Sequence, residues 1–147
     1  MFLGKFQHTI DSKGRLSIPA RFREILSVEH EGKLILTNDL SDKCIVAYTP
    51  KGWADLEAKI QKASSMDKVV KAFSRYFFSS AEDCSLDNQG RILIPPRLRE
   101  YASLSKEVLV TGGPNNKIEI WNPDLFEHTM AAFDSESITT RLAELGI

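Results

Sequence analysis

The sequence predicts an α+β protein, mainly β, that is built from two copies of one structural unit. Residues 11–24 recur as residues 87–100, and eight of the fourteen positions are identical. A match of this length at a fixed offset indicates an internal duplication. Short apolar runs typical of strands surround both copies, with turn residues between them. At 147 residues, the chain is therefore expected to form two small intertwined halves.

Each copy begins with a turn motif. In the first copy Asp11 stands three residues before Gly14, so the carboxylate can accept backbone N–H bonds and the glycine can adopt a left-handed conformation. Ile10 precedes this turn and Leu16 follows it, and we expect the turn to join two strands in a hairpin. Arg15 directly follows the glycine and should lie beside an exposed tip. The second copy repeats the pattern with Asp87, Gly90 and Arg91.

A short basic helix is expected after each turn. Pro19 and Pro95 cannot donate to a strand ladder and suit the first turn of a helix, which predicts helices over residues 20–26 and 96–102. Each helix carries two arginines, namely Arg21 and Arg23, and Arg97 and Arg99. The two arginines of a pair point to different faces. At most one per helix should share the surface of the turn, and the other should pair with an acid such as Glu24 or with a neighbouring subunit.

The remaining elements follow the same order in both halves. Apolar runs predict strands over residues 5–10, 33–37, 44–48, 108–111 and 117–121. Polar turns over 38–42 and 112–116 separate them, and Pro50 and Pro123 then open helices. Four apolar side chains of the predicted helices are expected in the core: Phe22, Leu98, Trp53 and Phe126.

Two helical patterns lie between the copies. The first has an apolar face made of Trp53, Leu56 and Ile60. In the second, Ser64 resembles a helix cap and Asp67 suits the first turn. An amphipathic stripe follows, made of Val69, Val70, Phe73 and Phe77. The predicted organisation is a first repeat over 1–62, a helical linker over 63–80, a second repeat over 81–133 and an acidic tail over 134–147.

Charge is segregated along the chain. The net charge of −1 looks unfavourable for a nucleic-acid partner, but the field at a surface depends on where the charges lie. Residues 1–26 carry a local charge of +3, whereas residues 124–147 carry −4 before the terminal carboxylate. The amino-terminal end is therefore suited to meet an anion.

Composition argues against several classes of protein. An apolar fraction of 42% is typical of a soluble globular protein, no apolar run approaches the roughly 20 residues of a membrane helix, and the first residues are too short and polar for a signal peptide. Cys44 and Cys84 are predicted to be buried or partly buried thiols in a reducing cytoplasm. The three histidines show no metal-ligand spacing, and neither a metal nor a cofactor is expected.

The paired motif Asp-x-x-Gly-Arg-x-x-Ile-Pro-x-x-Leu/Phe-Arg resembles that of the MraZ family of bacteria, and the resemblance covers nearly the whole chain. It implies a double AbrB-like fold, in which two swapped-hairpin halves form one β-barrel, and a homo-oligomeric ring. It also implies a transcriptional regulator, usually a repressor, of the cell-division and cell-wall gene cluster. Such a protein binds short direct repeats of double-stranded promoter DNA, in the cytoplasm and on the nucleoid.

The first copy is the leading candidate for contact with DNA. A guanidinium can bind a phosphate or a guanine edge through two bonds, which favours Arg15, and Lys13 at the tip should contact phosphate. Gln89 replaces this lysine in the second copy. The expected DNA-binding residues are Lys5, Lys13, Gly14, Arg15, Arg21 and Arg23. The second-copy residues expected to serve DNA binding or assembly are Asp87, Gly90, Arg91, Arg97 and Arg99.

Two other functions are open at this stage. An enzyme with two symmetry-related carboxylates would use Asp11 and Asp87, but the adjacent arginines would hold both ionised, and Asp11-Ser-Lys-Gly14 lacks the tight Asp-Ser/Thr-Gly turn. No phosphate-binding loop is present, so neither an enzyme nor a small-molecule substrate is expected. The second alternative is an antitoxin-like or scaffolding module, in which the acidic tail over 134–147 holds a protein partner.

Overall fold

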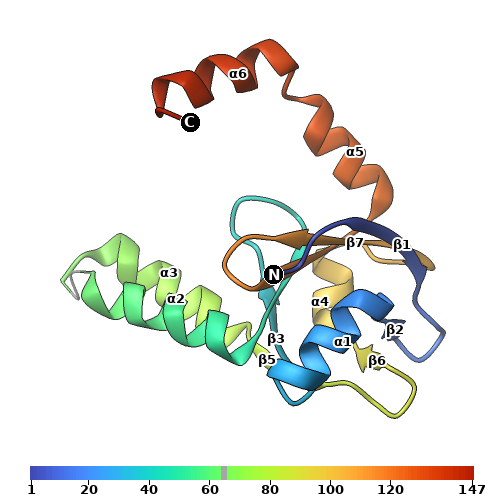
Figure 1. The fold of residues 1–147 in the computed structure, drawn as a ribbon. Helices are drawn as coiled ribbons and strands as arrows, with labels where there is room; N and C mark the ends of the chain where they lie inside the picture. Colours follow the sequence, from blue (N-terminus) through green and yellow to red (C-terminus); the bar gives the residue numbers. More distant parts are fainter. Residues whose placement is uncertain (64–65) are drawn as a thin grey trace.

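The computed structural model describes residues 1–63 and 66–147, and its main feature is a six-stranded antiparallel sheet (Figure 1). The order of its strands is β1-β7-β8-β4-β3-β5. They are β1 (Lys5–Thr9), β3 (Lys33–Asn38), β4 (Ile45–Tyr48), β5 (Glu82–Ser85), β7 (Glu107–Gly113) and β8 (Lys117–Trp121). A second, two-stranded sheet consists of β2 (Arg15–Ser17) and β6 (Arg91–Leu93). The predicted α+β class is confirmed.

The two copies of the repeat exchange strands. In the large sheet β1 of the first copy pairs with β7 of the second, and β5 of the second copy pairs with β3 of the first. The counterparts β4 and β8 pair at the centre, and β2 pairs with β6. The strand order reads the same from either edge once each strand is replaced by its counterpart. Neither copy can therefore complete its sheet alone.

This exchange changes the predicted hairpins. Ile10 and Leu16 form a single antiparallel bridge, and the Asp11 N–H donates to the Arg15 carbonyl at 3.0 Å. Beyond this point the strands diverge, because β1 forms a five-residue ladder with β7 and β2 pairs with β6. The hydrogen-bonded sheet is open, with β1 and β5 at its edges, so the ladders of the described strands do not close into a barrel.

One hydrophobic core joins both sheets to helices α1 (Ala20–Glu29) and α4 (Pro96–Tyr101). Phe22 and Leu98 are buried in it, as predicted. The Phe22 ring meets the rings of Phe2 and Phe6 edge to face, at centroid distances of 5.1 and 5.3 Å. The two helices extend over nearly the predicted residues, although α1 continues for one further turn.

Helices α2 (Pro50–Lys62) and α3 (Lys68–Ser79) form a pair that projects from one side of the body (Figure 1). The Trp53 ring stacks on Phe77 with centroids 5.3 Å apart. Asp67 is the cap of α3 rather than a first-turn residue, because its carboxylate accepts the N–H groups of Val69 and Val70. The predicted cap at Ser64 lies outside the described residues.

A second arm leads away from the body and consists of α5 (Pro123–Ala131) and α6 (Ser135–Glu144) (Figure 1). Phe126 packs edge to face on Trp121, with centroids 5.4 Å apart. Both Phe126 and Trp53 are only half-buried, so their predicted place in the core is wrong: they fasten the arms to the outside of the sheet. No helix of the described residues is long and apolar enough to cross a bilayer.

Candidate nucleic-acid interface

The turn of the first copy is built around one aspartate. Oδ1 of Asp11 accepts the backbone N–H groups of Lys13 and Arg15, both at 2.9 Å, and Oδ2 accepts Nε–H of Arg15 at 2.7 Å. The Gly14 N–H donates to the Asp11 carbonyl at 3.0 Å, and Gly14 has a φ of +85°. Glycine adopts this conformation at little steric cost. The roles of Asp11 and Gly14 as turn formers are confirmed.

The second copy forms the same turn bond for bond. Oδ1 of Asp87 accepts the backbone N–H groups of Gln89 and Arg91 at 2.8 and 2.9 Å, and Oδ2 accepts Nε–H of Arg91 at 2.9 Å. Gly90 has a φ of +73°. The duplication therefore preserves local geometry as well as sequence.

Strand exchange holds the two turns together on one side of the molecule (Figure 1). The Gly14 carbonyl accepts the N–H of Ile94 at 2.9 Å, and the Gly90 carbonyl accepts the N–H of Ile18 at 3.0 Å. Each turn is thus bonded to the strand end of the other copy. The sequence predicted both turns but not this mutual attachment.

Both aspartates contact the motif arginines as ionised groups. The backbone hydrogen bond from Arg15, supported by its side-chain bond, lowers the pKa of Asp11 to about 2. The pKa of Asp87 is lowered in the same way, with the backbone bond from Arg91 as the largest cause. The Arg15 side chain contacts Asp11 through Nε and remains 34% exposed. Nη1 of Arg91 also lies 4.0 Å from Oδ2 of Asp11, which links the charges of the two turns.

The second arginine of each basic helix covers the turn of the other copy. A methyl group on Gly90 would lie 2.3 Å from Cδ of Arg23, and one on Gly14 would lie 2.8 Å from Cζ of Arg99. Nε–H of Arg99 donates to a backbone carbonyl at 3.1 Å, whereas Nε of Arg23 is buried with no hydrogen-bond partner in the described part of the chain. The sequence left open which arginine of each helix would lie at the turn surface and which would pair with an acid such as Glu24 or with another subunit. The sequence signal for this shared role was that Arg23 and Arg99 occupy equivalent positions in the two copies of the repeat.

The remaining cations of the predicted sites lie in different surroundings. Lys13 and Arg21 are exposed. Arg97 donates from Nη2 to the Ser80 carbonyl at 3.0 Å. Nζ of Lys5 lies 5.5 Å from the centre of the Phe126 ring, at the far end of β1, roughly 13 Å along the strand from its turn. The structure therefore places Lys13 on the same turn as Arg15, brings Arg15 and Arg91 to the same Asp11 carboxylate, and engages Lys5 elsewhere.

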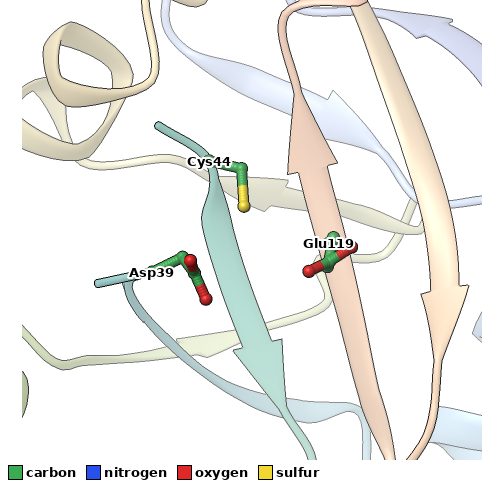
Figure 2. A group of neighbouring side chains, drawn as sticks. All are labelled: Asp39, Cys44 and Glu119. Carbon is green, nitrogen blue, oxygen red and sulfur yellow. The ribbon is translucent and has the colours of Figure 1, made fainter. Parts of the chain in front are cut away.

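A separate group of ligand-type side chains lies beside β4 and consists of Asp39, Cys44 and Glu119 (Figure 2). Their possible ligand atoms all lie within 4.8 Å of one another. The Asp39 carboxylate already accepts two backbone N–H groups, and Glu119 accepts Nε1–H of Trp121 at 3.4 Å. Burial, with the neighbouring carboxylates, raises the pKa of the Cys44 thiol far above its usual range. We interpret this group as part of the packing of the sheet, because the thiol is protonated and both carboxylates already accept hydrogen bonds within the chain.

The fold and the turns define a duplicated α+β protein whose two copies of one turn motif interlock. The family model described as "MraZ protein, putative antitoxin-like" matches residues 1–76 and again 77–145. Proteins named "Transcriptional regulator MraZ" are similar throughout: that of Caldicellulosiruptor saccharolyticus is 44% identical over all of both chains, and that of Moorella thermoacetica is 49% identical over 86% of this chain and 85% of its own. The chain belongs to the MraZ family.

Among solved structures, the solution structure of PHS018 from Pyrococcus horikoshii matches 82% of this chain and 88% of its own. The sequence identity is 18% and the TM-score is 0.33, a likeness too slight to assign the fold in more detail.

Proposed function

We propose that the chain is a transcriptional regulator that binds double-stranded promoter DNA through its paired turns. The observation that carries the proposal is that the two turns, which carry Lys13, Arg15 and Arg91, are fastened together by strand exchange. Cations on a tight turn can meet the phosphate backbone, which dominates the affinity of DNA-binding proteins. The full-length relatives are named transcriptional regulators, which supports the same class of function.

The aspartates suggest how the arginines would be presented. Asp11 contacts Arg15 through Nε, and this bond limits the rotation of the guanidinium before any ligand arrives. The terminal Nη groups are the edge that binds a phosphate or the O6 and N7 atoms of guanine. Lys13 would add a phosphate contact that Gln89 cannot supply. We therefore assign the DNA contact mainly to the first copy and assign the second to DNA or to assembly.

Several copies are expected to act together. A pair of turns offers few cations, so one chain would bind weakly, whereas linked copies gain from a high effective concentration at successive sites. We propose a ring of subunits on direct repeats of the promoter, with an AbrB-like swapped-hairpin arrangement in each chain. The proposed role is repression of the cell-division and cell-wall gene cluster, on the nucleoid in the cytoplasm. The exchanged strands of this chain support the swapped arrangement.

Binding to the DNA upstream of the chain's own gene tests the proposal. Fluorescence anisotropy would compare wild type with Arg15→Ala and Arg91→Ala, which remove the same internal bond from the two equivalent turns. We expect Arg15→Ala to weaken binding at least tenfold and Arg91→Ala to weaken it less. Lys13→Gln gives the first turn the residue found in the second turn, and its loss of affinity should lie between those of Arg91→Ala and Arg15→Ala. Equal binding by wild type and Arg15→Ala would overturn the assignment.

An antitoxin-like or scaffolding module is the second candidate. The description of the matching family includes the term antitoxin-like, and the carboxy-terminal arm is exposed and acidic. Co-purification with one partner protein in a fixed ratio, together with no retention on upstream DNA, would favour this candidate over the regulator.

A further inference from the structure

Helix α3 exposes an apolar stripe beside positive charge. Val69 is 76% exposed and Ala72 is exposed beside it. Tyr76 follows and is 37% exposed, although its hydroxyl accepts Nδ2–H of Asn38 at 3.1 Å. Their spacing of three and then four residues places them on one side of the helix. Lys68 and Arg75 border this side, and α3 contains three cations and no acid. We call this surface the α3 stripe.

Helix α6 exposes a second apolar stripe. Ile138, Leu142 and Leu145 are 42%, 38% and 56% exposed, and their spacing of four and then three residues aligns them on one face. Every described residue from 131 to 147 is exposed, so this amphipathic helix covers no part of its own body. We call this surface the α6 stripe.

The two stripes are complementary in charge. On α6 Arg141 already bonds Glu144 at 2.9 Å. Glu136 and the N-cap residue Asp134, whose carboxylate accepts the Ser137 N–H, have no balancing cation on that helix. Helix α3 carries the opposite excess. Two apolar faces of similar length, one on a basic helix and one on an acidic helix, bury their apolar area and satisfy their charges best against each other.

We propose that the α6 stripe of one copy docks on the α3 stripe of a second copy of this chain. The contact joins two different surfaces, so a pair of bound copies still offers one free α3 stripe and one free α6 stripe. Such a head-to-tail contact closes into a ring or continues as a filament. Both arms project away from the side of the paired turns (Figure 1), which leaves the turns accessible. The inference deepens the proposed ring assembly and rests on it.

Cysteine cross-linking between separate chains tests the contact. One chain would carry Val69→Cys and the other Leu142→Cys, both with Cys84→Ser because Cys84 is only partly buried. Thr140→Cys is the matched control, since residue 140 lies on the opposite face of α6. After mild oxidation of the mixture, we expect the Val69→Cys and Leu142→Cys chains to link at least tenfold more than the Val69→Cys and Thr140→Cys chains.

The mass of the wild-type assembly, measured by light scattering, separates the possible failures. Equal linkage at residues 142 and 140, or disulfides formed only between two Leu142→Cys chains, would overturn the docking. If the wild type is nevertheless oligomeric, the proposed ring stands. A monomeric wild type at tens of micromolar would overturn both, and promoter binding would still be judged from the Arg15 variants. As a second variant, Leu142→Asp changes an exposed side chain, should keep its helix content, and should lower the mass of the assembly.

Discussion

At the scale of single residues, the turn motif combines three roles that its sequence spacing predicts. The aspartate accepts the backbone bonds, the glycine supplies the positive φ, and the arginine follows at the tip. The position of Arg23 over Gly90 could not be predicted in this way. That contact joins residues of different copies, and it exists only because the strands are exchanged.

The depressed pKa of Asp11 predicts a specific loss of stability in acid. Its folded value of about 2 lies below the ordinary value of 3.8, so the unfolded chain binds more protons between these pH values. The stabilisation from the ionised carboxylate is complete above pH 4 and is lost as the pH falls towards 2. The difference in melting temperature between wild type and Asp11→Asn should therefore be largest at neutral pH and shrink below pH 4.

Circular dichroism melts from pH 7 to pH 2 would measure this difference. Asp87→Asn removes the equivalent carboxylate, whose pKa is also lowered, and should change with pH in the same direction. A difference that stayed constant down to pH 2 would show that the charge of Asp11 does not contribute.

Gly90 should tolerate alanine less well than another glycine of the same conformation. Gly32 has a φ of +69°, and a methyl group there would meet Leu86 at an ordinary 3.6 Å, whereas one on Gly90 would lie 2.3 Å from Arg23. Gly32→Ala should cost the left-handed strain of about 1 kcal/mol. Gly90→Ala should cost roughly 1–2 kcal/mol more because of the overlap.

Urea unfolding of the two glycine variants would measure the difference, and Arg23→Ala supplies the second arm of the experiment. In that background the extra cost of Gly90→Ala should disappear. Equal losses for Gly32→Ala and Gly90→Ala in the wild-type background would contradict the packing of Arg23 on the turn.

At the scale of elements, helix α3 illustrates how far periodicity predicts packing. Its apolar spacing predicted a helix correctly, but Val69 is exposed rather than part of the packed face. The reason is that α3 packs through Phe77, which stacks on Trp53 of α2 and on Phe73. Which part of an apolar stripe becomes buried depends on the partner helix, and the sequence of α3 alone does not specify that partner.

Removal of the α3 cap should loosen the helical pair. Asp67→Ala deletes the acceptor of the Val69 and Val70 N–H groups and should cost about 1 kcal/mol of local stability. Native-state hydrogen exchange would detect faster exchange at the start of α3, with little change in the central strands. Asp67→Asn keeps an acceptor and should exchange like wild type. Uniformly faster exchange across the molecule would argue instead that α3 unfolds with the body.

At the scale of the whole molecule, strand exchange joins the two turns, one from each copy, into one surface. The pairing of β2 with β6 and the bonds from Ile18 and Ile94 to the opposite turns fix the separation of the two turns. A surface made by long-range pairing moves as a unit, since shifting one turn would break bonds in both copies. This rigidity is what a protein needs to present arginines in a fixed register on DNA.

Promoter binding by this surface should depend steeply on salt. Each phosphate neutralised releases condensed counterions, so the logarithm of the binding constant should fall linearly with the logarithm of salt concentration. Lys13→Gln should reduce the slope by about one for each turn in contact with DNA. Anisotropy titrations over roughly 50 to 300 mM salt would measure this slope. A slope near zero would contradict contact through phosphates.

The sequence by itself determined the duplicated unit, the residue roles within each turn, the strand and helix types and the family resemblance, because all of these depend on spacing between near neighbours. Only the tertiary structure decided that β1 and β5 pair outside their own copies, that Arg23 and Arg99 cover the opposite turns, and that Lys5 lies away from them. The physical reason is that a local pattern fixes which bonds a segment can make. The choice among partners is made by the burial and hydrogen bonding of the whole chain.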